Sequence, residues 1–123
     1  MHPPRRLLVA TDFSACSAWA TERAALLARQ CGSEVVLLHV VAQNTLVDLA
    51  RMLHEVVDAA RARAEQAARH DLVLLAGALS QRHGIHADTV IVTGPVVGGI
   101  VDTATTRDCD LLVLGARGTN PVR

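Results

Sequence analysis

Two glycines that flank an arginine, directly after an apolar run, have the clearest capacity for chemistry in this sequence. The run Leu111–Leu114 is followed by Gly115, Arg117 and Gly118 in a Gly-x-x-Gly turn. Because glycine has no Cβ, an anion can approach the backbone N–H groups of such a turn. A guanidinium beside them can bind phosphate oxygens through two parallel hydrogen bonds. The combination indicates a phosphate site, and the alternative is a plain strand-to-helix turn with a solvated arginine.

A single carboxylate follows the first apolar run of the chain, in the segment Ala10-Thr11-Asp12-Phe13-Ser14. At the carboxyl end of a strand, Asp12 could accept hydrogen bonds from ribose hydroxyls or lie near a Mg²⁺ ion. An aspartate at this position is also typical of a turn or a helix cap. The residues alone leave both interpretations open.

The sequence lacks the side chains of several common enzyme classes. All 12 of its lysine and arginine residues are arginines, which excludes a P-loop lysine and a Schiff-base lysine. No G-x-S-x-G segment marks a serine nucleophile. The histidines do not have the spacing of a zinc site, so we expect no resident metal. His39 lies inside an apolar run and is expected to be a hydrogen-bonded core residue.

The composition predicts one soluble domain over residues 1–123, with half of the residues apolar and no room for a second core. A formal net charge of zero removes the electrostatic basis for general nucleic-acid or anionic-membrane binding, so neither partner is expected. The apolar run Leu7–Ala10 is far too short for a membrane span or a signal-peptide core. Three cysteines without C-x-x-C spacing favour a reducing compartment, so we expect a cytoplasmic protein.

Four short apolar runs are predicted to be the strands that position the candidate residues. Their hydrophobicity is continuous instead of alternating, which is typical of strands buried on both faces. The runs are Leu7–Thr11, Val35–Val41, Thr89–Thr93 and Leu111–Leu114. Helical stretches separate them, so the sequence predicts parallel crossovers and an α/β fold.

The shorter connecting helices carry recognisable start and stop residues. We expect the first helix to begin after the cap Ser14 and to end at Gly32. A later helix is expected to open after Gly94-Pro95, and the pair Gly98-Gly99 would allow it to pack closely on the sheet. The predicted core face of the first helix consists of Ala20, Ala24, Leu27 and Cys31.

A longer helix is predicted between these two, from about Leu46 to His83. Its apolar stripe is predicted to consist of Leu46, Leu49, Leu53, Val57, Ala60, Ala64 and Ala67, continued by Ala68, Leu72, Leu75 and Leu79. The segment 71–77 has the composition of a strand, but good helix formers surround it and no turn signal precedes it. We therefore predict helix there, with a stop at Gly84.

The order and spacing of four segments make the chain from Leu7 to about Gly118 resemble the universal stress protein domain family. The segments are Ala10-Thr11-Asp12-Phe13-Ser14, Leu37-Leu38-His39-Val40, Gly94 with Ile100 and Ala104, and Asp110-Leu111-Leu112-Val113-Leu114-Gly115-Ala116-Arg117-Gly118. The resemblance implies an open, doubly wound parallel sheet of the adenine-nucleotide alpha-hydrolase-like type, in strand order 3-2-1-4 with the fifth strand missing. In such sheets ligands bind beyond the carboxyl ends of the strands, where the strand order reverses.

By this resemblance the chain is expected to bind ATP or AMP, with Mg²⁺ as a possible companion of the phosphates, at the carboxyl edge of strands one and four. The base would lie against Ala10, Thr11 and Val40, and the ribose against Asp12. The phosphates would be held by the backbone N–H groups of Gly115 and Gly118 together with Arg117, and Leu114 is also expected to belong to the site. No general base is evident, so we expect no efficient catalysis.

The chain departs from the family pattern beyond the second glycine. The family's nucleotide motif continues to a Gly-Ser or Gly-Thr at a helix start, whereas this sequence ends at Arg123 before reaching one. This departure favours an alternative function, a non-nucleotide interaction module that contacts other proteins. The resemblance implies a homodimer for this module as well, and an ATP-hydrolysing enzyme is the third interpretation.

Overall fold

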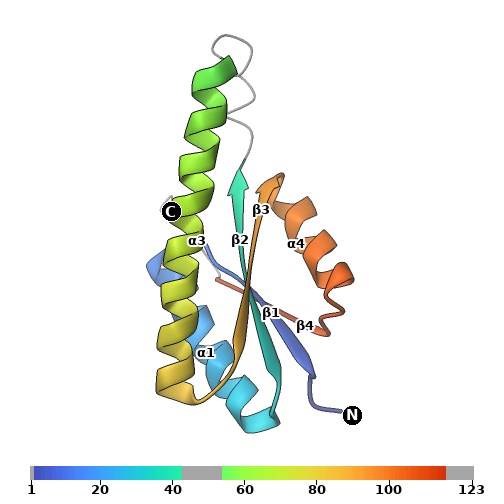
Figure 1. Ribbon diagram of the computed structural model, residues 1–123. Coiled ribbons are helices and arrows are strands. Elements are labelled where there is room, and N and C mark those ends of the chain that lie inside the picture. The colour runs from blue at the N-terminus through green and yellow to red at the C-terminus, as the bar shows by residue number, and fades with distance from the viewer. Residues whose placement is uncertain (1, 43–53, 116–123) are drawn as a thin grey trace, which may run out of the picture.

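Strands and helices alternate along the chain in the computed structural model, which describes residues 2–42 and 54–115 (Figure 1). The elements are β1 (Arg6–Ala10), α1 (Ala15–Cys31), β2 (Glu34–Ala42), α3 (His54–His83), β3 (Ala87–Gly94), α4 (Val96–Thr106) and β4 (Leu111–Leu114). All four predicted strands are present, and the predicted segment 71–77 is helix within α3. The prediction of an α/β fold is therefore confirmed.

The strands of the described chain form one parallel sheet in the order β3-β2-β1-β4, as predicted. The register pairs Ala10 with Leu38 of β2 and with Leu114 of β4, so the carboxyl ends of β1 and β4 lie level. After β3 the chain returns to the far side of β1, and the strand order reverses between β1 and β4. This is the point at which open α/β sheets bind ligands.

Alternating side chains of the central strands divide the core into two layers. Leu7 and Val9 pack with residues of α1 and α3, whereas Leu8 packs with residues of α4. Figure 1 shows the corresponding arrangement, with α1 and α3 on one side of the sheet and α4 on the other. Because helices cover both faces of the sheet centre, β1 and the first half of β2 are buried on both faces, as predicted.

The prediction that every strand is buried on both faces is wrong for the two edge strands of the described sheet, β3, which is mostly half-buried, and above all β4. Leu112 and Leu114 are 43% and 50% exposed. Both lie on the same face as Leu8, and α4 covers that face mainly over β2 and β3. Within the described residues β4 is an edge strand, and continuous hydrophobicity does not distinguish an edge strand from a central one.

The caps of α1 lie where the sequence predicts them. The Ser14 hydroxyl accepts a hydrogen bond from the Ser17 backbone N–H at 3.2 Å, which satisfies one of the free donors of the first turn. Gly32 ends the helix with a left-handed φ of 68°, a conformation that glycine adopts without a steric penalty.

The core face of α1 is rotated relative to the prediction. Its fully buried residues are Ser17, Thr21, Ala24, Ala25 and Ala28. Only Ala24 belongs to the predicted set, since Ala20, Leu27 and Cys31 are half-buried. Two of the buried residues are polar, and the Thr21 hydroxyl is satisfied by donating to the Ser17 carbonyl at 2.7 Å. Apolar periodicity gives no signal for a helix face that begins with two hydroxyl residues, Ser17 and Thr21.

The second half of the predicted α3 stripe is largely correct, and two residues of its first half are not. Ala68, Leu72 and Leu79 are buried, whereas Ala64 and Ala67 are exposed. Glu65 takes the inward position in this part of the helix, because its carboxylate accepts a hydrogen bond from the Thr93 hydroxyl at 2.6 Å. Residues 46–53 of the prediction lie outside the described residues, as do the side chains of residues 54–58. None of the helices that the structure describes combines the length and apolar character needed to span a membrane.

Close packing of α4 on the sheet depends on Gly99, as the sequence predicts for the glycine pair. A Cβ at Gly99 would lie 3.0 Å from a methyl carbon of Val40 and 3.0 Å from one of Val92. At Gly98 the nearest atom to an added Cβ is 3.8 Å away, an ordinary contact. Gly99 therefore sets the distance between α4 and the carboxyl half of β2 and β3.

Candidate functional site

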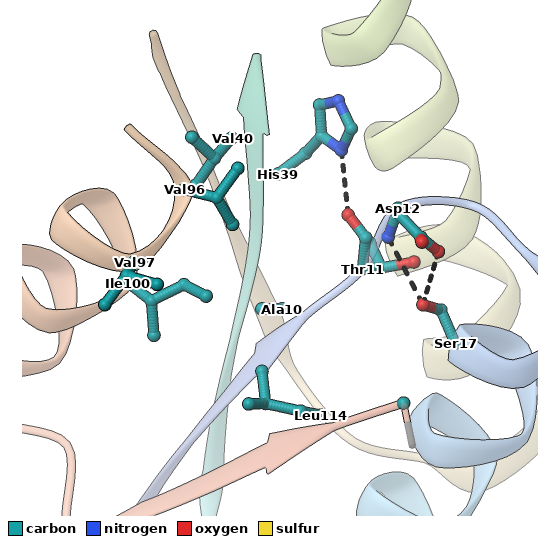
Figure 2. Close-up of a pocket in the computed structure, with 11 residues that line it drawn as sticks. Ala10, Thr11, Asp12, Ser17, His39, Val40, Val96, Val97, Ile100 and Leu114 are labelled. Atoms are coloured by element: carbon teal, nitrogen blue, oxygen red, sulfur yellow. Dashed lines mark hydrogen bonds between the residues drawn. The ribbon is translucent and has the colours of Figure 1, made fainter. Parts of the chain in front are cut away.

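A pocket of about 360 Å³ lies at the carboxyl edge of the sheet, between the ends of β1, β2 and β4 and the first turns of α1 and α4 (Figure 2). It is lined by Ala10, Thr11, Asp12, Ser17, His39, Val40, Val96, Val97, Ile100, Leu114 and Gly115. Six of the eight residues predicted for the site are in this lining: Ala10, Thr11, Asp12, Val40, Leu114 and Gly115. Arg117 and Gly118, the other two, lie outside the described residues.

Asp12 is a turn residue and a pocket residue at once, so the two interpretations of it are compatible. Its Oδ1 atom accepts hydrogen bonds from the Ser14 backbone N–H at 2.9 Å and from the Ser17 hydroxyl at 2.6 Å. Partial burial acts to raise the pKa of Asp12, but the hydrogen bonds from Ser14 and Ser17 outweigh it and hold the pKa below its usual value. The carboxylate is therefore held ionised and oriented at the edge of the pocket.

Ser17 is a site residue that the sequence analysis missed. Besides donating to Asp12 Oδ1, its hydroxyl oxygen accepts from the Asp12 backbone N–H at 3.3 Å, and the residue is only 3% exposed. Figure 2 shows these two contacts linking the end of β1 to the first turn of α1. The only signal in the sequence was its place three residues after the cap Ser14, which also suits an ordinary helix start.

Gly115 is required by a close approach between two backbones. A Cβ at this position would lie 3.0 Å from the backbone nitrogen of Ser17 and 3.1 Å from the carbonyl carbon of Cys16. The end of β4 thus packs directly against the first turn of α1. This packing explains why a glycine is needed at position 115, because a side chain would separate two walls of the pocket. The rest of the predicted turn, residues 116–118, lies outside the described residues.

His39, which lies on the opposite face of β2 from Val40, contacts the turn between β1 and α1 through a hydrogen bond. Its Nδ1 atom lies 2.8 Å from the Thr11 carbonyl oxygen, and since a carbonyl can only accept, Nδ1 carries the proton. Its ring also lies against Phe13, with ring centroids 4.7 Å apart. The predicted hydrogen bond of His39 is confirmed, but its predicted place in the core is wrong, because the residue is only half-buried and lines the pocket. Its partner, Thr11, also lines the pocket, and the Thr11 backbone N–H donates to the Leu38 carbonyl at 2.9 Å.

The apolar wall opposite Asp12 comes from α4 and was not predicted. Val96, Val97 and Ile100 line the pocket across from Ala10 and Leu114 (Figure 2). Their contribution depends on the crossing of α4 over the sheet, which sequence spacing does not define.

The chemistry of the pocket is apolar on most sides, with one carboxylate and no arginine among the described lining residues. Among residues 2–42 and 54–115, no three His, Cys, Asp or Glu side chains gather closely enough to hold a metal ion. Such a lining suits a flat apolar ring that carries hydroxyl or amino donors.

The chain matches the model of the universal stress protein family over residues 4–123. Among solved structures, it is 27% identical to universal stress protein UspA from Lactobacillus plantarum, with a TM-score of 0.71 over 98% of this chain and 82% of that one. A comparison with curated proteins finds no significant match.

Two more distant structures share the fold. The hypothetical protein MJ0577 is 21% identical, with a TM-score of 0.83 over 97% of this chain and 79% of that one. A universal stress protein in complex with cAMP is 17% identical, with a TM-score of 0.57 over 89% and 70% of the two chains. Together with the strand order and the match along nearly the whole sequence, these comparisons agree with the resemblance seen in the motifs. The chain belongs to the universal stress protein family.

Proposed function

We propose that this protein binds an adenine nucleotide, ATP or AMP, at the carboxyl edge of β1 and β4. The observation that carries the proposal is that Asp12 and Gly115, from opposite ends of the sequence, line one pocket at the switch point of the sheet. The pocket volume of about 360 Å³ falls within the usual range for small-molecule sites.

The lining suggests which part of the nucleotide lies where. The base fits the apolar walls at Ala10, Val40 and Ile100, and the ribose hydroxyls fit the carboxylate of Asp12. The phosphates would then extend past Gly115 towards the Gly-x-x-Gly turn predicted from the sequence. One carboxylate together with phosphate oxygens is a donor set that suits Mg²⁺, so a metal ion would arrive with the nucleotide.

The relatives support a nucleotide ligand in general terms. A universal stress protein of the same fold has been crystallised in complex with cAMP, an adenine nucleotide. Because that protein is only 17% identical to this chain, the choice of ligand here rests on the pocket and not on the relative.

The proposal is tested by calorimetric titration of the full chain with ATP and with AMP, repeated on two variants of β4. Leu114→Glu places a negative charge in the pocket and is expected to weaken binding by at least about tenfold. The matched control is Leu112→Glu, which changes a residue of similar exposure on the same face of the strand, outside the pocket lining. Equal binding by both variants, or no binding by the unchanged chain, would contradict the proposal.

Any hydrolysis at this site would be slow. The one carboxylate that lines the pocket has a lowered pKa and two hydrogen-bond donors on one oxygen, which makes it a poor general base. We therefore propose a binding protein and not an enzyme.

A second candidate function is an interaction module, as a cytoplasmic homodimer or with other proteins. It is favoured by the outer face of α1, where Trp19 is 73% exposed and Leu26, seven residues later, is 45% exposed. Exposed tryptophan is typical of interface anchors. Absence of any heat with ATP and AMP would favour this function over nucleotide binding.

A further inference from the structure

We propose that the outer face of α1 is a docking surface for an acidic protein segment, one that carries apolar side chains flanked by carboxylates. This α1 surface consists of six exposed residues: Ala15, Ala18, Trp19, Arg23, Leu26 and Arg29. The inference rests on the second candidate function, the interaction module, and names the chemistry of its partner. It does not depend on nucleotide binding, because none of the six residues lines the pocket at the sheet edge.

Trp19 and Leu26 form the apolar centre of the α1 surface. They are seven residues apart, so they lie two turns from each other on the same side of the helix. Trp19 is 73% exposed, although tryptophan is highly buried on average in folded proteins. A groove of about 490 Å³ lies beside it and is lined by Ala15, Ala18, Trp19 and Glu22. The two alanines leave room there for an apolar side chain of a partner.

A second, smaller hollow lies on the α3 side of the groove. It has a volume of about 150 Å³ and is lined by Thr11, Phe13, Ser14, Ala18 and Leu75. Ala18 lines both hollows, so they adjoin at this residue. A cavity of about this volume accommodates a single benzene-sized ring. The surface can therefore take two apolar side chains from one partner segment, as in the docking of an amphipathic helix into a groove.

The charge of the α1 surface is positive. Within residues 2–42 and 54–115, no carboxylate lies at salt-bridge distance from Arg23 or Arg29. Glu22, the acidic residue of α1, is already bound from α3, since Oε1 accepts from His83 Nε2 at 2.8 Å and Oε2 accepts from Arg82. The hydrogen bond from His83, followed by that from Arg82, holds the pKa of Glu22 below its usual value. A partner with carboxylates would supply the counter-charge for the two arginines.

The same charge argues against two other occupants. A second copy docked through a two-fold axis would set Arg23 and Arg29 against the same arginines, and like charges across an interface are costly. Anionic membranes attract clusters of about four to eight basic residues, whereas α1 has two arginines. An acidic segment satisfies the arginines and covers the apolar centre. Its carboxylates could also accept from the indole N–H of Trp19, which can only donate.

The test uses two synthetic peptides of about 18 residues, or five helical turns, with one face of leucines and the other face of glutamates in one peptide and lysines in the other. The chain has one tryptophan and no tyrosine, so its fluorescence reports on Trp19 alone. The glutamate peptide is expected to shift the Trp19 emission to shorter wavelength, because docking removes the indole from water. It should bind at least about tenfold more tightly than the lysine peptide, and less so in high salt.

The decisive variant is Arg23→Glu, which should weaken binding of the glutamate peptide about tenfold, because an attraction becomes a repulsion. The matched control is Arg107→Glu. It makes the same change of charge at an exposed residue that ends α4, on the other side of the sheet (Figure 1), and should leave binding unchanged. Trp19→Ala, measured by calorimetry, should also weaken binding at least about tenfold, since exposed tryptophan is the predicted anchor.

Equal binding of the two peptides, or binding of neither, would overturn the inference. So would an equal loss of binding in Arg23→Glu and Arg107→Glu. A shift of the Trp19 emission with phosphatidylserine vesicles and not with the glutamate peptide would overturn it in favour of a membrane. A shift with rising concentration of the chain alone would overturn it in favour of a second copy and leave the interaction module intact. Absence of heat with ATP and AMP would contradict nucleotide binding without affecting this inference.

Discussion

At the scale of single residues, the site depends on a few polar contacts at the turn between β1 and α1. Asp12 receives two donors on one oxygen, and the Thr11 carbonyl receives the Nδ1 proton of His39. Each of these groups would lose hydrogen bonds to water on partial burial, and each is satisfied by a neighbour in the turn. The protein itself thus orders the turn, which would lower the entropic cost of binding the proposed nucleotide.

Removal of the Ser17 hydroxyl is expected to raise the pKa of Asp12. The hydroxyl donates to the ionised carboxylate, and loss of such a bond favours the protonated form. The folded-state pKa of Asp12 lies below its usual value, so its contribution to stability is present above about pH 4 and is lost as the pH falls further. Ser17→Ala should therefore destabilise the protein at neutral pH and less so in acid.

NMR titration of the Asp12 carboxyl group and urea unfolding between neutral and acidic pH measure the two effects. The control is Thr21→Val, which removes a buried hydroxyl from the next turn of α1 without touching Asp12. An equal change of the Asp12 pKa in both variants would show that the Ser17 hydroxyl has no specific role.

At the scale of elements, the pocket exists because two glycines let backbones and helices come close. Gly115 brings the end of β4 against the first turn of α1, and Gly99 brings α4 down onto Val40 and Val92. In both places an added methyl group would meet atoms at about 3 Å, closer than a normal contact. The walls of the pocket therefore lie close together because Gly99 and Gly115 have no side chains.

The neighbouring glycines of α4 are expected to respond to alanine in opposite directions. Gly99→Ala would overpack the interface with Val40 and Val92 and should cost about 1–3 kcal/mol of unfolding free energy. Gly98→Ala has only Pro95 within 3.8 Å and should stabilise the helix by about 0.5–1 kcal/mol. Chemical denaturation of the two variants beside the unchanged chain measures both values. A stabilising Gly99→Ala would contradict the assigned packing role.

At the scale of the whole molecule, the sheet connects segments that are far apart in the sequence. β4 pairs with β1, and Asp110 just before β4 accepts hydrogen bonds from the backbone N–H groups of Arg5 and Arg6 at 2.9 Å and 3.0 Å. The same pairing brings Leu114 level with Ala10 at the opposite edge, where the pocket lies. The hydrogen bonds of Asp110 at the amino edge of the sheet thus support the pairing of β1 with β4, and this pairing brings the pocket residues Ala10 and Leu114 together.

Asp110→Asn is expected to lower the melting temperature at neutral pH. The N–H groups of Arg5 and Arg6 hold the pKa of Asp110 below its usual value, so the ionised form stabilises the fold above about pH 4. The difference between variant and unchanged chain should shrink as the pH falls and Asp110 becomes protonated.

Thermal melts at several pH values test this expectation. Asp108→Asn is the control, because Asp108 is an exposed neighbour with φ of 56° and asparagine tolerates that backbone conformation. A pH-independent difference for Asp110→Asn, or the same pH dependence in the control, would contradict the role assigned to the Asp110 carboxylate.

The sequence by itself determined the elements and their order. Continuous apolar runs, the caps Ser14 and Gly32, and the stop at Gly84 depend on local chemistry, so strands, helix ends and the family could be recognised without coordinates. Six of the predicted site residues line the pocket because the carboxyl ends of parallel strands share one edge.

Only the tertiary structure decided which faces are buried and which additional residues complete the pocket. Ser17 lies on the buried face of α1 although it is polar, and Glu65 takes an inward position on α3 because Thr93 is there to donate to it. Val96, Val97 and Ile100 reach the site through the crossing of α4 at Gly99. These outcomes depend on contacts between segments distant in sequence, and local periodicity carries no information about a partner that another element supplies.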